Sequence, residues 1–208
     1  MDLTHARRAS LKLDPASEEG QKTGPRHTRP VLFAAGTDTT SSTIEWAMAE
    51  VLRNPQVLLK AKKELEQAIS KGNPIEECDI NRLPYLQAII KETFRLHPVV
   101  PLLLPRRAGS DADLFGFKVP EGSQVLVNVW AIDVKGRDFG LIPFGAGRRI
   151  CPGLPLASRM LHLMLGSLIN SFDWELDGGM SPSEMNMEEK FGITLQMAEP
   201  LRAIPVLV

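Results

Sequence analysis

The sequence contains few cysteines, almost no net charge and no long hydrophobic run. Two cysteines in 208 residues, Cys78 and Cys151, exclude a disulfide-rich scaffold and suit a reducing compartment, and we do not expect them to pair. A formal net charge of −1 excludes the basic composition typical of nucleic-acid-binding proteins. No window reaches the run of about 18 apolar residues that a transmembrane helix needs, so we expect no membrane anchor in this chain.

Helical periodicity is the main pattern that the sequence does contain. Residues 31–208 are expected to form one domain of a mainly α (helix-rich α+β) fold, whereas residues 1–30 mix charges without apolar periodicity, which predicts disorder. Apolar spacing predicts helices over about 31–53, 55–70, 84–96 and 153–171. Alternating residues predict two small β-hairpins, one at 115–117 with 125–129 and one at 193–195 with 201–204.

Cys151 stands in the glycine-rich stretch 144–153 (FGAGRRICPG), directly ahead of the last predicted helix. Glycines allow unusual backbone angles and a close approach to a large planar ligand. A helix N-terminus favours the thiolate form of cysteine, and a thiolate can hold the iron of a haem group. Phe144 is then expected to cover the sulfur side of the ring, and Arg149 offers a forked donor to a propionate. The alternative is a buried structural cysteine in a glycine-rich turn.

The residue types of this stretch resemble a family signature. The pattern F-x-x-G-x-R-x-C-x-G of the cytochrome P-450 family is matched by Phe144, Gly147, Arg149, Cys151 and Gly153. The resemblance implies the carboxy-terminal half of that fold, a haem cofactor with Cys151 as its iron ligand, and electrons from NADPH through a reductase. It also implies a monooxygenase that inserts one oxygen atom from O₂ into a small hydrophobic plant metabolite.

The tail of the chain, residues 189–205, is similar to the geraniol hydroxylase-like branch of the plant microsomal members. This similarity implies a substrate such as a monoterpenoid, and a substrate pocket lined in part by Gly192, Ile193 and Thr194. The family also implies the endoplasmic reticulum membrane, whereas a chain without the anchor is expected in the cytoplasm.

The stretch 34–42 (AAGTDTTSS) inserts hydroxyl groups into an otherwise apolar predicted helix. Ser and Thr compete for backbone hydrogen bonds, so we expect a distorted groove with Ala35 and Gly36 at the substrate pocket. The stretch resembles the oxygen-activation motif of the family, which implies that Thr39 holds the oxygen ligand and its water while Asp38 relays protons. Taken alone, these residues fit a Ser/Thr-rich helix start equally well.

Glu92 and Arg95 lie three residues apart on one face of the predicted helix 84–96. They match the E-x-x-R motif of the family, a structural ion pair that we expect to be buried, whereas an isolated pair of this kind is usually exposed to solvent. Downstream, Arg106 aligns with a family residue that contacts a haem propionate. The alternative is that Arg106 is an ordinary surface arginine.

The chain departs from the family in two ways. It lacks roughly the amino-terminal half, which in the family carries the membrane anchor and most of the substrate pocket. In addition, Ile132 runs directly into Asp133, where family members place a segment whose arginine completes a charge triad with the E-x-x-R pair. A competing hypothesis is therefore a non-catalytic haem-binding remnant or an unstable product of a deleted gene, with exposed apolar faces on helices 31–53 and 153–171.

Overall fold

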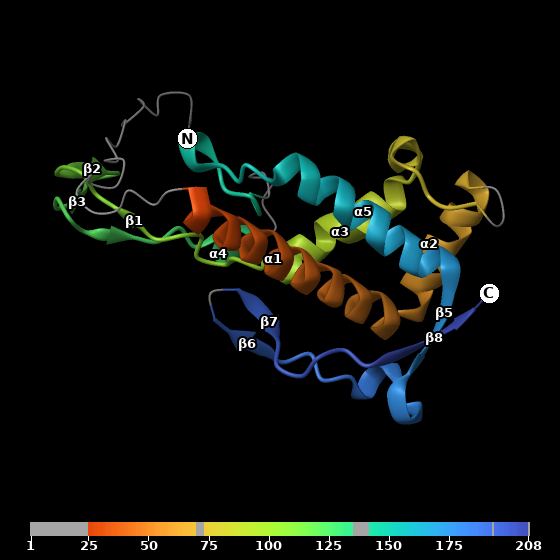
Figure 1. Cartoon of the computed structure of the whole chain (residues 1–208). Coiled ribbons are helices and arrows are strands. Elements are labelled where there is room, and N and C mark those ends of the chain that lie inside the picture. The colour runs from red at the N-terminus through yellow and green to blue at the C-terminus, as the bar shows by residue number, and fades with distance from the viewer. Residues whose placement is uncertain (1–24, 70–72, 135–141, 193, 208) are drawn as a thin grey trace, which may run out of the picture.

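The structure is a computed structural model that describes residues 25–69, 73–134, 142–192 and 194–207. These residues contain the helices α1 (Pro25–Arg53), α2 (Pro55–Ala68), α3 (Pro84–Leu96), α4 (Val129–Val134) and α5 (Leu154–Ser171) (Figure 1). Short 3-10 helices lie in the connections: η1 (Glu77–Arg82), η2 (Gly147–Arg149), η3 (Asp177–Gly179) and η4 (Pro182–Glu184). The predicted helix-rich α+β fold is confirmed.

The hydrophobic core lies where α1, α2, α3 and α5 pack against one another. Each helix contributes fully buried side chains to it, which are Trp46, Val51, Leu65, Leu86, Leu161, Leu165 and Ile169. The three residues from α5 are spaced by four, so one stripe of this helix faces the core. Burying such a side chain stabilises the fold by about 1.5–3 kcal/mol.

Gly166 allows α5 to approach α3 closely. A Cβ atom at this position would lie 2.7 Å from Cδ1 of Ile75 and 3.1 Å from Cδ2 of Leu86. Both of these side chains are buried, so neither has free space into which to move. Glycine in the middle of a helix costs about 1 kcal/mol relative to alanine, and the close approach of the two elements offsets that cost.

Helix α3 begins with Pro84, and a carboxylate from a neighbouring helix caps it. Glu64 of α2 accepts hydrogen bonds from the backbone N–H groups of Tyr85 at 2.7 Å and Leu86 at 2.9 Å. These two donors have no partner within their own helix, so the carboxylate satisfies both of them. In addition, the ammonium group of Lys60 lies over the Tyr85 ring, 4.2 Å from its centroid, and ties α2 to α3 a second time.

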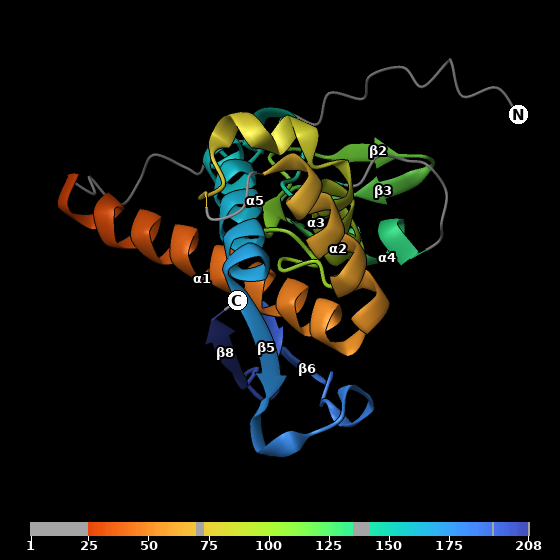
Figure 2. The same cartoon turned by 90° about the vertical axis from the view of Figure 1, so that its right-hand side faces the viewer.

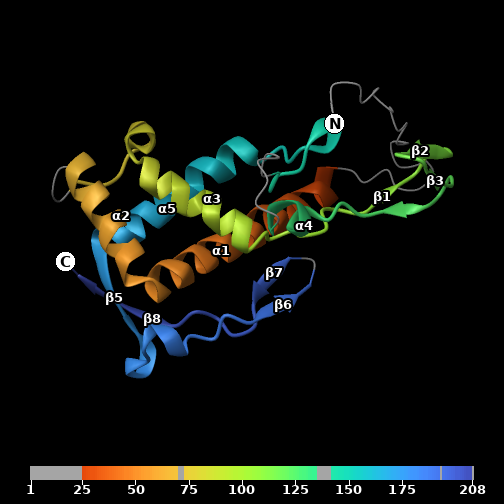
Figure 3. The same cartoon turned by 180° about the vertical axis from the view of Figure 1, so that it is seen from behind.

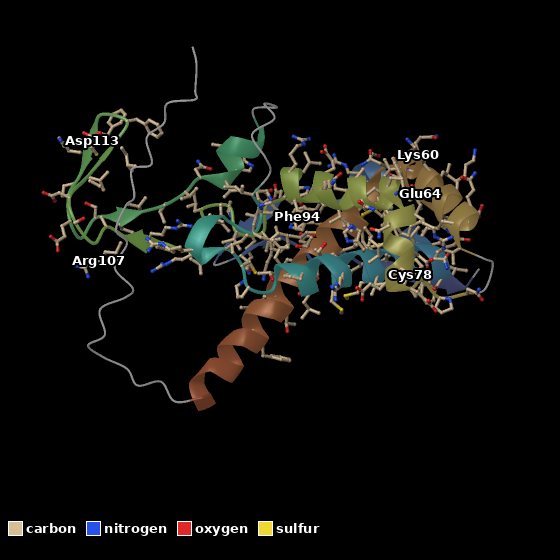
Figure 4. All side chains as sticks on the ribbon, turned by 90° about the horizontal axis from the view of Figure 1, so that it is seen from above. Lys60, Glu64, Cys78, Phe94, Arg107 and Asp113 are labelled. Atoms are coloured by element: carbon tan, nitrogen blue, oxygen red, sulfur yellow. The ribbon has the colours of Figure 1, made fainter. Side chains whose placement is uncertain are left out.

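The described strands form four antiparallel pairs. They are β1 (Arg106–Arg107) with β4 (Gln124–Val125), β2 (Ala112–Leu114) with β3 (Phe117–Val119), β5 (Phe172–Leu176) with β8 (Ala203–Leu207), and β6 (Glu189–Phe191) with β7 (Leu195–Met197). Figure 4 shows the β2–β3 hairpin, which carries Asp113, at the opposite end of the molecule from Lys60 and Glu64, with Phe94 between them. The β6–β7 hairpin lies alongside α1 (Figures 1 and 3).

The strand pairing differs from our sequence predictions. The predicted pairing of 115–117 with 125–129 is wrong, because Phe115 and Gly116 form the turn of the β2–β3 hairpin, residues 124–125 pair with Arg106–Arg107, and Val129 begins a helix. The predicted pairing of 193–195 with 201–204 is wrong, because the two segments belong to different sheets. These strands are only two to five residues long, so their partners are chosen by tertiary packing rather than by alternation.

Helix α1 also differs at its start. It begins at Pro25, inside the segment 1–30 for which disorder was expected, and proline is favourable in the first turn of a helix. Residues 1–24 lie outside the described residues. The other predicted helices agree with α2, α3 and α5 to within two residues at each end.

Candidate functional site

Residues 142–153, which we call the cysteine loop, lead directly into α5. Gly145 and Gly147 have φ angles of 70° and 72°, a left-handed conformation that glycine adopts without strain. The loop is closed by a hydrogen bond of 2.9 Å from the Cys151 N–H to the Phe144 carbonyl. Gly153 is the N-cap of α5, so the half-buried Cys151 lies two residues ahead of the helix N-terminus, close to the predicted position.

Side chains from two other segments hold the cysteine loop in place. The Phe144 ring meets the Phe94 ring of α3 edge to face, with centroids 5.4 Å apart. Leu103 also lies beside the loop, because a Cβ atom at Gly145 would lie 3.6 Å from Cδ1 of Leu103. The backbone of Leu103 has a left-handed φ of 50°. Neither Phe94 nor Leu103 was among the site residues predicted from the sequence. Phe94 lies between the two charged residues of the E-x-x-R motif, and this position could have identified it.

The chemistry of the cysteine loop fits a haem group. A Cβ atom at Gly153 would lie 3.7 Å from the Cys151 sulfur, an ordinary van der Waals distance, so the Gly153 backbone lies close beside the sulfur. The described part of the chain has no cluster of three or more His, Cys, Asp or Glu side chains that would hold a bare metal ion. A single thiol beside flat glycine turns suits a metal that a planar ligand carries and that takes one ligand from the protein.

The hydroxyl-rich stretch 34–42 forms regular helix rather than the distorted groove that we expected. Its hydroxyl groups donate to carbonyls four residues earlier, which are Thr37 to Phe33, Thr39 to Ala35, Ser41 to Thr37 and Thr43 to Thr39, at 2.8–2.9 Å. This bonding satisfies these four hydroxyl groups within a continuous helix, so the groove prediction is wrong. Ala35, Gly36 and Asp38 are exposed and Thr39 is half-buried, on the part of α1 that extends beyond the bundle in Figure 2.

The predicted ion pair forms, but it is not buried. Arg95 donates to Glu92 in a bidentate arrangement, with Nε to Oε2 at 2.8 Å and Nη2 to Oε1 at 2.6 Å. The side chains are 39% and 54% exposed, so the expectation of a buried pair is wrong in this structure. The hydrogen bonds from Arg95 lower the pKa of Glu92 below its ordinary value.

The two arginines proposed for the propionates lie on different elements. Arg106 is half-buried on β1, paired with Val125 of β4, and Arg149 is exposed at the end of η2. Of the proposed pocket residues, Gly192 is exposed and Thr194 half-buried in the turn between β6 and β7, while Ile193 lies outside the described residues. Their roles stay predictions.

Cys78 lies apart from the cysteine loop, in η1 (Figure 4). Both cysteines are free thiols, as expected. Partial desolvation and the neighbouring charge of Asp79 raise the pKa of the Cys78 thiol, and a contact with the Glu76 carboxylate acts in the same direction. Cys78 is therefore held in its protonated, unreactive form.

This fold and this cysteine loop define a class of protein, the cysteine-ligated haem proteins. The chain belongs to the cytochrome P450 family, whose model matches residues 19–135 and 133–201. Membership implies haem as the cofactor. Within the described residues, no helix has both the length and the apolar character needed to cross a bilayer.

Curated relatives and solved structures agree with this family. The chain is 58% identical to a geraniol 8-hydroxylase of Catharanthus roseus, over 84% of this chain and 40% of that protein. It is 53% identical to a drimenol monooxygenase of Persicaria hydropiper, over 85% of this chain and 40% of that protein. A zebra fish cytochrome P450 with abiraterone superimposes with a TM-score of 0.79 at 33% identity, over 86% of this chain and 46% of that one. The chain therefore spans about two fifths of the length of these curated relatives.

The comparison also bears on the junction of Ile132 and Asp133. The family match divides into two parts that meet at residues 133–135. The alignment with the Catharanthus roseus enzyme spans 197 positions, whereas 84% of this 208-residue chain is about 175 residues, so about 22 positions have no residue here. Both findings agree with a segment missing at this junction, which lies inside α4.

Proposed function

We propose that this chain is the haem-binding, carboxy-terminal part of a plant monooxygenase that inserts one oxygen atom from O₂ into a small terpenoid. The single observation that carries the proposal is the geometry of the cysteine loop, in which Gly145 and Gly147 adopt left-handed turns and the half-buried Cys151 lies just ahead of α5. The identity of 58% to a geraniol 8-hydroxylase supports a monoterpenoid such as geraniol as the substrate.

Cys151 is the proposed iron ligand, and the neighbouring residues position the haem group. When bound, haem supplies the activation of O₂, and a thiolate ligand favours cleavage of the O–O bond. Phe144, which contacts Phe94, is proposed to cover the Cys151 sulfur and to exclude water from it. Arg106 and Arg149 are proposed to hold the propionates through their guanidinium groups, while Gly147 and Gly153 keep the backbone close to the ring.

Thr39 and Asp38 are proposed to handle protons for the reaction. The Thr39 hydroxyl donates its hydrogen to the Ala35 carbonyl at 2.8 Å, so its oxygen has lone pairs with which to accept from a water molecule. Thr39 would therefore hold a water rather than donate directly, and the exposed Asp38 carboxylate beside it would exchange protons with solvent. The proposed wall of the substrate pocket consists of Ala35 and Gly36 on α1 with Gly192 and Thr194 on the β6–β7 turn, and of Ile193, which lies outside the described residues.

The proposed partners follow from the same chemistry. Electrons for O₂ reduction come from NADPH through a membrane-bound reductase, and the working place of the whole protein is the endoplasmic reticulum membrane. The test is to load the purified chain with haem and supply reductase, NADPH and geraniol. We expect a product heavier by one oxygen atom from wild type and from Cys78→Ser, which removes the other cysteine, and none from Cys151→Ser.

The second candidate is a non-catalytic haem-binding remnant, and a specific observation favours it. Leu156, Met160 and Met164, spaced by four along α5, are 66%, 40% and 38% exposed and form an apolar stripe on the surface, as the sequence predicted. Haem uptake through Cys151 without oxygenated product would support this candidate. An absence of haem uptake by wild type would contradict both.

A further inference from the structure

His97 lies in a bridging position between two elements that are far apart in the sequence. It is the C-cap of α3 and is buried, and its ring stacks on the Trp46 ring of α1 with centroids 3.8 Å apart and planes 6° from parallel. Nε2 lies 2.9 Å from Oε1 of Glu50 on α1, and Nδ1 lies 3.4 Å from Oε1 of Glu189 on β6. One imidazole therefore contacts α1 by stacking and by hydrogen bonding, and β6 from its other side.

The chemistry of these contacts depends on the protons of the ring. A carboxylate only accepts hydrogen bonds, and a neutral imidazole has a single N–H, so a neutral ring donates to one of the two carboxylates at most. A doubly protonated ring donates to both and is also attracted to the indole face. The charged groups that face His97 in the described structure are Glu50 and Glu189, with Arg53 adding its charge beside Glu50.

The β6–β7 hairpin has few other polar anchors at this point. The Leu195 N–H donates to the Val99 carbonyl at 2.8 Å, just past the end of α3, and the side chains of Leu195 and Met197 are buried beneath the hairpin. The side chains of β6, in contrast, are all exposed, and among them Glu189 contacts His97. The His97 bridge is therefore a polar link between β6 and α1, in addition to the buried side chains of β7 and the packing of β7 on α1.

We infer that His97 is a positioning residue that fixes the β6–β7 hairpin against helix α1, more firmly when both ring nitrogens carry a proton. The hairpin turn carries Gly192 and Thr194, so the bridge sets where this wall of the proposed substrate pocket stands relative to α1. Only this last step rests on the proposed function, because the bridge itself requires neither haem nor substrate.

Hydrogen exchange of individual amides in the chain as it exists tests the inference. The Leu195 amide reports docking of the hairpin, and the Asp177 amide, which donates to the Arg202 carbonyl beside the β5–β8 pair, is the reference. Rates are corrected for the intrinsic effect of pH and compared at about pH 5.5 and about pH 8.5. We expect Leu195 to be protected several-fold more strongly at the acidic value, and the reference amide to change little.

Three variants separate the bridge from general stability. His97→Phe keeps a ring on Trp46 but removes both hydrogen bonds, and we expect it to lower Leu195 protection about tenfold at pH 5.5 and to abolish the pH dependence. Glu189→Gln, at a more exposed position, should reduce the pH dependence without threatening folding. Glu188→Gln removes the same charge one residue away, without a contact to His97, and should behave as wild type.

Two results would overturn the inference. One is Leu195 protection that is the same at both pH values in wild type and unchanged in Glu189→Gln. The other is an equal effect of Glu188→Gln and Glu189→Gln, which would show a general charge effect. Because no haem is needed in this experiment, its failure leaves the proposed function standing, and failure of haem binding leaves the bridge standing.

Discussion

Replacing Gly166 by alanine tests whether α5 and α3 are packed as closely as the structure has them. In a helix interior, alanine is favoured over glycine by about 1 kcal/mol. The new methyl group would lie 2.7 Å from Ile75 and 3.1 Å from Leu86, both buried, and overpacking of this kind costs about 1–3 kcal/mol. We therefore expect Gly166→Ala to lower the free energy of unfolding by up to about 2 kcal/mol despite the better helix propensity.

Gly36 of α1 provides the matched control. A Cβ atom there would meet nothing within 4 Å, so Gly36→Ala gains the helix propensity without the clash. The difference between the two variants isolates the steric cost, expected at about 1–3 kcal/mol. Urea unfolding followed by circular dichroism measures it. Equal stabilisation by both substitutions would refute the close packing at Gly166.

Two further predictions concern carboxylates. Glu64→Ala should lower the free energy of unfolding by about 0.5–2 kcal/mol, because it leaves the Tyr85 and Leu86 amides uncapped. Glu66→Ala on the same helix is the control. Equal losses of unfolding free energy in the two variants, measured by urea unfolding, would contradict the cap. The hydrogen bond from His97, opposed in part by burial, lowers the pKa of Glu50 below 4.5. A carboxyl group whose pKa is lower in the folded state stabilises the fold at pH values above its ordinary pKa. This stabilisation is lost as the pH falls through the folded-state pKa. The stability advantage of wild type over Glu50→Gln should therefore shrink on acidification below about pH 5, and a constant advantage would contradict the ionised contact.

The sequence predicted helix ends better than strand partners, for a local reason. Pro55 and Pro84 stand in the first turns of their helices, and His97 before Pro98 ends α3, so proline gives a local signal for each of these boundaries. Strand pairs of two to five residues have no comparable local signal. The pairing of Arg106–Arg107 with Gln124–Val125 depends on how the intervening hairpin projects, which alternation does not encode.

In the candidate site, too, local features were predictable from the sequence and long-range contacts were not. The cysteine loop was predictable because its glycines, cysteine and following helix are contiguous in the sequence. The contact between Phe94 and Phe144 joins residues fifty positions apart, and the His97 bridge joins α3 to residues before and after it in the chain. Such contacts arise from packing of the helices. The prediction of a distorted groove in α1 was wrong because hydroxyl groups such as those of Thr39 and Thr43 bond to helix carbonyls without breaking the helix.

The most direct test of the central claim is a carbon-monoxide difference spectrum of the reduced chain, expressed with a haem precursor, beside Cys151→Ser and Cys78→Ser. Thiolate ligation gives a strongly red-shifted Soret band. We expect this band in wild type and in Cys78→Ser, and its loss in Cys151→Ser. A chain without the band, or a band that survives in Cys151→Ser, would contradict the assignment of Cys151 as the ligand of the haem iron.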